Sequence, residues 1–329
     1  MAVPLLVVED LSVEFHTDEG IVKAVSNMSW ELAAGETMAI LGESGSGKSV
    51  SVQAVMGLLP MPPAVIAGGS IRYGDTELIG SEPSVLRNIR GPEIAMIFQD
   101  PLSALNPVYR VGWQIAEMFR MHEGASRSEA RTRSIDLMQR VGIPNPEIRF
   151  RQYPHEFSGG MRQRAMIAMA LALNPKVLIA DEPTTALDVT VQAQIMDLLG
   201  QIQADTNMGL ILITHDLGVV ASVADRVIVM YAGRTVETGD AESFYRRPAH
   251  PYSKGLMRSV PRITGPLERL HSIDGTPPSV VDLPAGCAFA TRCPEVHDRC
   301  TERPALIQIG DRTRTAACHL VGEPVGEAV

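Results

Sequence analysis

The stretch that decides the fold is Gly42–Ser49, which reads GESGSGKS. It matches the pattern G-x-x-x-x-G-K-[ST], in which glycines let the backbone curl tightly around a chain of phosphates. An apolar run, residues 37–41, precedes it, and a helix-compatible run, residues 50–56, follows it. Strand, glycine loop and helix in this order are typical of a P-loop. The sequence therefore predicts that the chain binds a nucleoside triphosphate.

The chemistry of this loop assigns a role to its residues. Successive backbone N–H groups beside a helix N-terminus attract an anion. We expect Lys48 to reach the β- and γ-phosphates and the Ser49 hydroxyl to ligate Mg²⁺. A glycine-rich turn that matches by chance is the alternative, and the flanking strand and helix disfavour it. The expected nucleotide contacts are Gly42, Ser44, Gly45, Ser46, Gly47, Lys48, Ser49 and Val50.

Length and composition narrow the possible functions. The 329 residues suit one large domain and a smaller one. A net charge of −9 argues against a nucleic-acid partner, and 5% aromatic residues disfavour a stacking platform for single strands. The N-terminus lacks the basic region of a signal peptide. The apolar run 165–173 is far shorter than the roughly 20 residues of a membrane span, so we expect a soluble, cytoplasmic protein.

Alternating strand and helix patterns predict an α/β fold: a P-loop NTPase-type, largely parallel sheet core with an antiparallel β subdomain and a helical subdomain. We place the nucleotide-binding domain at 1–245, with the helical subdomain at about 100–170. A separate C-terminal module, 246–329, holds ten of the 23 prolines and all four cysteines. The expected strands are 5–15, 21–32, 37–41, 70–73, 94–98, 177–180, 210–214 and 227–231. Helices are expected in 111–142, 157–173, 191–204 and 217–224, and a loop at 61–69.

Two acidic residues end the apolar strand 177–180. An acidic side chain at such a strand end can hold Mg²⁺ through water, and a second one can orient or deprotonate the attacking water. We assign Asp181 to the metal and Glu182 to the water as the catalytic base. Without the phosphate loop, two solvated carboxylates in a turn would be the preferred interpretation.

Several motifs occur in a fixed order along residues 5–245: GESGSGKS, Gln99, the run 157–163 (FSGGMRQ), Asp181-Glu182 and His215. With this set the sequence resembles the nucleotide-binding subunit of an ABC transporter. Residues 186–188 (ALD) match the D-loop of that family. Met161 departs from it, because the family usually has Gln after Ser-Gly-Gly.

The resemblance implies roles for the remaining motif residues. Ser158, Gly159 and Gly160 precede a helix, so they form a second anion site that caps the γ-phosphate of ATP on a partner subunit. A plain helix N-cap is the alternative. Gln99 is expected to touch Mg²⁺ or the attacking water, and His215 to donate to the γ-phosphate. His16, or Phe15 beside it, is the candidate for stacking on adenine.

The four cysteines lie within the last 43 residues of the chain: Cys287, Cys293, Cys300 and Cys318. Disulfides are uncommon in cytoplasmic proteins, so clustered thiols suggest a metal site, although the spacing is not that of paired C-x₂-C zinc motifs. The segments 247–253, 286–294 and 318–319 resemble the tail of oligopeptide and dipeptide importer ATPases. Some members of that group carry a four-iron four-sulfur cluster, and the resemblance implies one here. Zinc, or free thiols without metal, are the alternatives.

The same resemblance implies an ATP-hydrolysing subunit of a peptide importer. Its expected partners are a second, related ATPase, two transmembrane permease subunits and, indirectly, an extracytoplasmic substrate-binding protein. The chain would then work at the cytoplasmic face of the membrane, with 100–111 docking on the permeases. Import of nickel, glutathione or antimicrobial peptides is an alternative, and so is a soluble ATPase that acts on nucleic acid or ribosomes.

Overall fold

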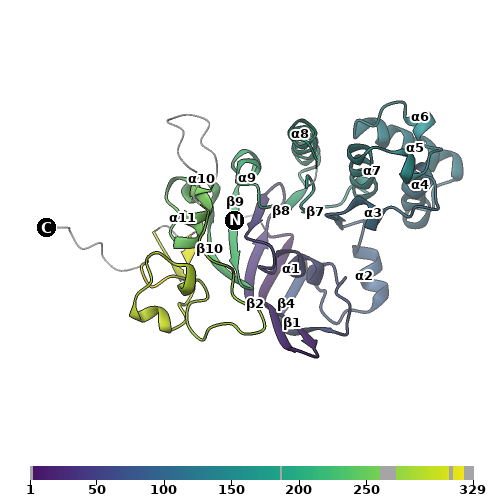
Figure 1. The fold of residues 1–329 in the computed structure, drawn as a ribbon. Coiled ribbons are helices and arrows are strands. Elements are labelled where there is room, and N and C mark those ends of the chain that lie inside the picture. The colour runs from purple at the N-terminus through teal and green to yellow at the C-terminus, as the bar shows by residue number, and fades with distance from the viewer. Residues whose placement is uncertain (1–2, 186, 260–271, 311–313, 322–329) are drawn as a thin grey trace. The chain divides into compact units, whose positions relative to one another are not determined.

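The computed structural model describes residues 3–185, 187–259, 272–310 and 314–321 (Figure 1). The chain divides into two compact units, each assembled from segments that are not continuous in sequence. The described residues of unit 1 fall within Met1–Leu6, Leu32–Glu36 and Tyr73–Ile213, and those of unit 2 fall within Val7–Glu31, Thr37–Arg72 and Thr214–Val329. We describe each unit by itself.

Unit 1 contains three parallel strands in the order β8-β7-β6. They are β6 (Ile94–Ile97), β7 (Val177–Asp181) and β8 (Gly209–Ile213), and every residue in them is buried. Strands buried on both faces read as continuous apolar runs, which is why the sequence revealed all three. The register sets Val177 opposite both Ile94 and Gly209, so the carboxyl ends of β6 and β7 meet at one edge.

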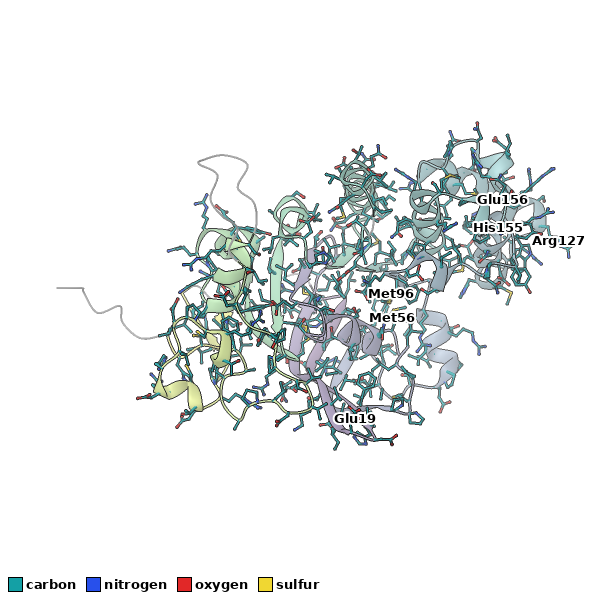
Figure 2. All side chains as sticks on the ribbon, viewed as in Figure 1. Glu19, Met56, Met96, Arg127, His155 and Glu156 are labelled. Atoms are coloured by element: carbon teal, nitrogen blue, oxygen red, sulfur yellow. The ribbon has the colours of Figure 1, made fainter. Side chains whose placement is uncertain are left out.

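In unit 1, residues 101–171 fold mainly into helices, α3 to α7 (Figure 1), and a separate helical subdomain at about 100–170 stays a prediction. Residues 111–142 contain two helices, because Glu123–Ala125 interrupt the run and Ser126 caps the second, its Oγ accepting from the Glu129 N–H at 3.3 Å. Met96 on β6 is buried, whereas His155 and Glu156 are exposed (Figure 2). The other elements of unit 1 are β5 (Thr76–Glu77), α2 (Pro83–Ile89), α3 (Pro101–Ala104), α4 (Val111–His122), α5 (Arg127–Arg140), α6 (Pro146–Arg149), the 3-10 helix η1 (Pro154–Glu156), α7 (Gly159–Leu171) and α8 (Val189–Thr206).

Unit 2 contains strands in the orders β2-β1-β4 and β11-β12-β10-β9-β3. In the second set β3 and β9 are parallel, while β9, β10, β12 and β11 pair antiparallel, so the sheet is mixed. The strands are β1 (Leu6–Thr17), β2 (Gly20–Leu32), β3 (Thr37–Leu41), β4 (Ala64–Tyr73), β9 (Arg226–Tyr231), β10 (Arg234–Asp240), β11 (Ile307–Gln308) and β12 (Thr315–Ala316). The helices are α1 (Lys48–Val55), α9 (Leu217–Val223), α10 (Ala241–Arg246), α11 (Pro251–Arg258), and the 3-10 turns η2 (Ala290–Arg292) and η3 (Asp298–Thr301). The expected loop at 61–69 is wrong from Ala64 onward, where β4 begins.

One apolar core in unit 2 joins segments from both sides of residue 245. Leu41 of β3 and Val229 of β9 belong to the same cluster as Tyr252 and Phe289. Tyr231, Tyr252 and Phe289 pack ring against ring, with centroids 4.7 to 5.4 Å apart. The domain boundary near 245 stays a prediction, and the described residues on its two sides share this core. Within the part of the chain that is described, no helix has both the length and the apolar character of a membrane span.

Candidate nucleotide site

The phosphate loop lies in unit 2, between β3 and α1. Gly47 has φ +99° and ends the loop as the N-cap of α1. A Cβ atom on it would lie 2.2 Å from the carbonyl oxygen of Ala24, a separation that real side chains do not show. Only glycine therefore fits where the backbone turns from the loop into the helix.

Lys48 is buried, with 6% of its surface exposed. Its Nζ donates to the carbonyl oxygens of Gly42 at 2.8 Å and Glu43 at 2.9 Å, so the ammonium group lies against the loop it follows. The Oγ of Ser46 is buried and has no hydrogen-bond partner among the described residues. A positive charge, a spare hydroxyl and a helix N-terminus thus meet at one loop, as an anion site requires.

The two candidate histidines also lie in unit 2. His215 is exposed and follows Thr214, whose N–H donates to the Ile40 carbonyl of β3, so His215 is held beside the strand that leads into the phosphate loop. His16 is exposed in β1, and its Nε2 lies 3.5 Å from a carboxylate oxygen of Glu14.

Gln99 and Glu182 come together in unit 1. The Gln99 amide donates to a carboxylate oxygen of Glu182 at 3.0 Å, and the Thr185 hydroxyl donates to the same oxygen at 2.8 Å. Glu182 has φ +47°, an uncommon backbone conformation for a non-glycine residue, and its N–H donates to the Ile213 carbonyl of β8. Asp181, the preceding residue, is buried at the end of β7. The left-handed turn at Glu182 thus directs adjacent carboxylates into different environments.

Ser158 is the N-cap of α7, and its Oγ accepts from the Met161 N–H at 3.3 Å. Ser158 and Gly159 are exposed, so the N–H groups at the start of this 13-residue helix face outward. Gln163 of the same helix donates to the Pro183 carbonyl, which links α7 to the turn after Glu182. Of the expected D-loop, residue 186 lies outside the described residues, while Asp188 caps α8 by accepting from the Val191 N–H at 2.9 Å.

All four cysteines line one small cavity in unit 2, together with His319 and Phe289. The cysteines are free, and burial raises the pKa of the Cys287, Cys293 and Cys318 thiols. In the described ranges, no group of three or more His, Cys, Asp or Glu side chains is placed so that it could hold a metal ion. The four expected thiol donors therefore line one cavity, but they are not positioned as the ligands of a metal ion.

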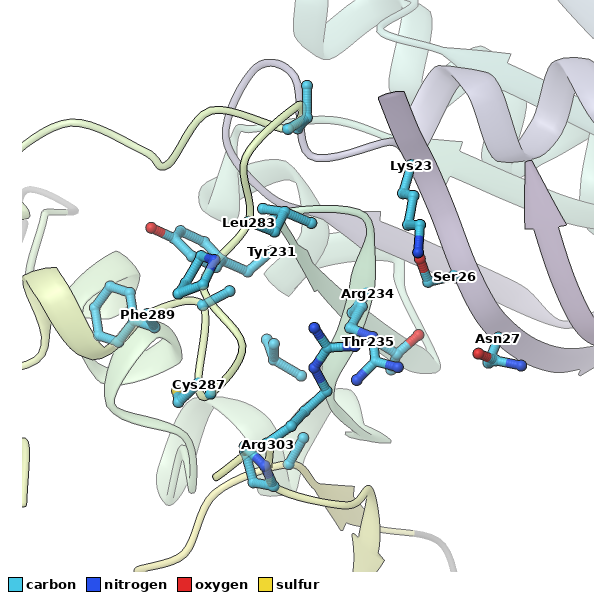
Figure 3. Close-up of a pocket in the computed structure, with 18 of the residues that line it drawn as sticks. Lys23, Ser26, Asn27, Tyr231, Arg234, Thr235, Leu283, Cys287, Phe289 and Arg303 are labelled. Carbon is cyan, nitrogen blue, oxygen red and sulfur yellow. The ribbon is translucent and has the colours of Figure 1, made fainter. Parts of the chain in front are cut away.

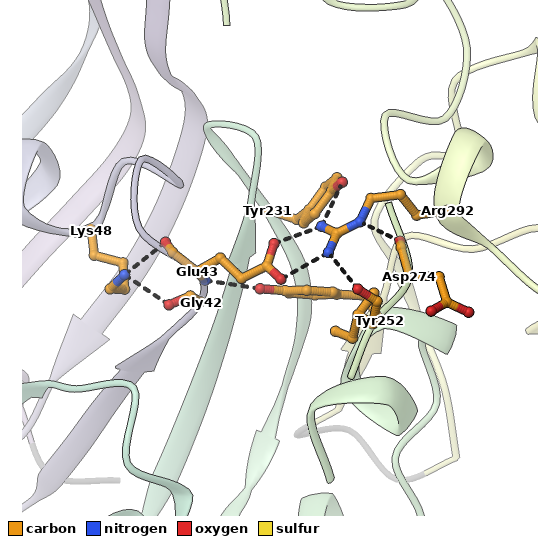
Figure 4. Close-up of polar contacts among 8 residues, drawn as sticks. Gly42, Glu43, Lys48, Tyr231, Tyr252, Asp274 and Arg292 are labelled. Carbon is orange, nitrogen blue, oxygen red and sulfur yellow. Dashed lines mark hydrogen bonds and ion pairs between the residues drawn. The ribbon is translucent and has the colours of Figure 1, made fainter. Parts of the chain in front are cut away.

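The sequence did not reveal that the C-terminal segment holds the phosphate loop. Arg292 donates to both carboxylate oxygens of Glu43, Nη1 at 2.6 Å and Nη2 at 3.0 Å, and Nη1 also donates to the Tyr231 hydroxyl at 3.3 Å (Figure 4). The Glu43 N–H donates to the Tyr252 hydroxyl at 2.9 Å. The hydrogen bonds of Arg292 to Glu43 and Tyr231, and the negative charge of Glu43, raise the pKa of Arg292. Glu43 occupies an unspecified position of the loop motif, so the motif gave no signal of this contact.

Comparisons with known proteins agree with this geometry. Residues 25–185 match the model of the ABC transporter family, and residues 236–300 match that of the oligopeptide/dipeptide transporter C-terminal region. The chain is 50% identical over 316 residues to the dipeptide transport ATP-binding protein DppD of Escherichia coli, covering 96% of each chain. It is 53% identical over 289 residues to the oligopeptide transport ATP-binding protein OppD of Bacillus subtilis, covering 88% of this chain and 81% of that protein.

Solved structures show the same fold. A dimeric, post-hydrolysis structure of the ATP-binding cassette MJ0796 bound to ADP and Pi has a TM-score of 0.64 and 26% identity, covering 72% of this chain and 98% of that chain. CbiO1 of Clostridium perfringens has a TM-score of 0.62 and 30% identity, covering 74% and 91% respectively. The expected α/β, P-loop fold class is confirmed. The chain belongs to the ABC transporter family, as an ATP-hydrolysing ATP-binding subunit.

Proposed function

We propose that this chain powers an importer of dipeptides or oligopeptides. The observation that carries the proposal is the match along nearly the whole chain to dipeptide and oligopeptide transport ATP-binding proteins, including the C-terminal region. Uptake of labelled dipeptide by vesicles that contain the chain and its membrane partners tests it. Uptake of nickel or glutathione in place of peptides would contradict the peptide assignment.

In this proposal the residues of the candidate nucleotide site all act on one Mg·ATP. Lys48 and the loop N–H groups hold the phosphates, while Ser49 and Gln99 would offer oxygen atoms to Mg²⁺ and Asp181 would hold it through water. Glu182 accepts the proton of the attacking water, and the Gln99 amide, 3.0 Å from the Glu182 carboxylate, orients that carboxylate. His215 donates to the γ-phosphate and stabilises its growing charge. Phosphoryl transfer needs mainly positioning and charge neutralisation, which these groups provide.

Glu182→Gln tests the mechanism. The amide cannot accept a proton, so we expect the variant, assembled with its partners, to bind ATP normally and hydrolyse it about a hundredfold more slowly or worse. Glu147→Gln, an exposed change in the same unit, is the matched control and should keep full turnover. Near-normal hydrolysis by Glu182→Gln would remove Glu182 from its assigned role.

We further propose that Ser158, Gly159 and Gly160 cap the γ-phosphate of ATP on a second, homologous ATPase subunit. Their exposure at the N-terminus of α7 supports this role, because outward N–H groups and the helix dipole attract an anion. Two permease subunits and an extracytoplasmic binding protein complete the proposed assembly, which places the chain at the cytoplasmic face of the membrane. We propose residues 100–111 as the permease contact and His16 as the adenine platform.

The cysteine cavity is proposed to hold a four-iron four-sulfur cluster, with zinc as the alternative. Four thiols around one cavity, none in a disulfide, are a donor set that suits either group. When bound, it would crosslink Cys287, Cys293, Cys300 and Cys318 and fix the loop path. Metal analysis of anaerobically purified protein decides: iron with visible absorbance supports the cluster, zinc supports the alternative, and neither metal contradicts both.

A further inference from the structure

A second cavity in unit 2 has no role in the function proposed above. Its volume is about 440 Å³, within the range of small-molecule sites. Residues of β2, the start of β10 and the C-terminal segment line it (Figure 3). Apolar side chains, Leu283, Tyr231 and Phe289 among them, form part of its wall, and polar groups form the rest. A cavity of this size with a mixed wall suits a ligand that has both an apolar body and a polar end.

The charges around this cavity are mainly positive. Lys23, Arg234 and Arg303 line it, and Asp282 is the single carboxylate among its lining residues. Among the described residues, no hydrogen-bond or ion-pair partner is found for the Arg234 or Arg303 side chain. Burial lowers the pKa of Arg234, and the positive charge of the nearby Arg303 lowers it further. Two like charges held together without a counter-ion cost free energy, which a bound anion would offset.

Thr235 provides an independent observation. Its side chain is 8% exposed and lines the same cavity, next in sequence to Arg234. Its Oγ1 is buried and has no hydrogen-bond partner in the described chain. A buried hydroxyl left without a partner is destabilising, and most buried polar groups in folded proteins have one. A ligand oxygen in the cavity would satisfy it.

We infer that this cavity binds a small organic carboxylate with an apolar body, its carboxylate lying between Arg234, Arg303 and the Thr235 hydroxyl. Guanidinium groups are the side chains best matched to a carboxylate, because they donate in a planar, forked geometry. The apolar body lies against Leu283 and the aromatic rings. This inference does not rest on ATP turnover, since the site shares no residue with the phosphate loop.

The test uses the purified full chain, saturated with Mg·ADP so that the nucleotide site is blocked. Leucylleucine is titrated calorimetrically against the wild type, with its C-terminal amide and inorganic phosphate as comparison probes. We expect leucylleucine to bind, and the amide and phosphate to bind at least about tenfold more weakly, because each lacks one half of the recognised chemistry. This comparison needs no variant, so it is independent of folding defects.

Variants then locate the site. The double variant Arg234→Gln/Arg303→Gln should weaken leucylleucine binding by about tenfold or more, and Thr235→Val, which keeps the shape, by about fivefold. Arg246→Gln, an exposed arginine of the same unit outside the cavity, should leave it unchanged. The inference is overturned by no heat at millimolar leucylleucine, by equal binding of acid and amide, by phosphate binding as tightly, or by wild-type affinity in either cavity variant.

Discussion

The contact between Arg292 and Glu43 allows a quantitative prediction. Arg292 is 4% exposed and Glu43 28%, so the pair lies between a surface and a buried ion pair. Exposed pairs contribute about 0.5 kcal/mol, and breaking a buried pair costs roughly 3–5 kcal/mol. With two charge-assisted hydrogen bonds and partial access of water to Glu43, we expect a coupling free energy of about 2 kcal/mol.

A double-mutant cycle of Arg292→Met and Glu43→Gln isolates this coupling, because the other hydrogen bonds of Arg292 cancel between its arms. Urea unfolding is followed by the fluorescence of Trp30, which is buried in unit 2, in a Trp113→Phe background that silences unit 1. The matched control is a cycle at the exposed Arg72–Glu9 pair, for which we expect about 0.5 kcal/mol or less. A coupling at Arg292–Glu43 no larger than that of the control would refute the reasoning.

Two further predictions concern stability. Burial lowers the pKa of His250 to about 4 from 6.5, so the unfolded state binds the extra proton and stability is lost as pH falls from about 6.5 to 4. His250→Asn, which can still cap α11, should reduce that loss by about 3 kcal/mol in urea titrations across this range; an unchanged pH profile would contradict it. Gly112→Ala would put a Cβ 2.2 Å from the Phe150 ring, so we expect a loss of about 1–3 kcal/mol in thermal unfolding. Gly200→Ala, with open space around its Cβ, should instead stabilise α8, and equal losses in both variants would show that crowding is not the cause.

The sequence predicted most reliably what the backbone itself demands. A buried parallel strand such as β7 needs an apolar run, here residues 177–180, and the phosphate loop needs glycine where no Cβ fits, as at Gly47. Both requirements leave marks that can be read without a structure. The sequence did not predict the hydrogen bond between Gln99 and Glu182, which forms because each residue closely follows a strand of one parallel sheet.

The sequence did not predict features that depend on contacts between residues far apart in the chain. The strand β10 is rich in polar residues and lacks the alternation of apolar residues that would have predicted it. One of its polar residues, the buried Glu237, accepts hydrogen bonds from the Ala249 and His250 N–H groups. The start of β4 was hidden by the preceding prolines. Arg292 and Glu43 are 249 residues apart, and Glu43 occupies an unspecified position of the phosphate-loop motif. Only the folded chain could reveal contacts of this kind.

The anchoring of Glu43 has a practical consequence for anyone who cuts or recombines this chain. A fragment that stops near residue 245 would keep every recognised ATPase motif yet lose Tyr252 and Arg292, the two side chains that grip the second residue of GESGSGKS. In a chimera that takes its C-terminal segment from a relative, we expect this contact to form only if both the acidic residue of the phosphate loop and the arginine of the C-terminal segment are present. The C-terminal segment, which the linear sequence places apart from the ATPase motifs, thus supports the phosphate loop in the folded chain.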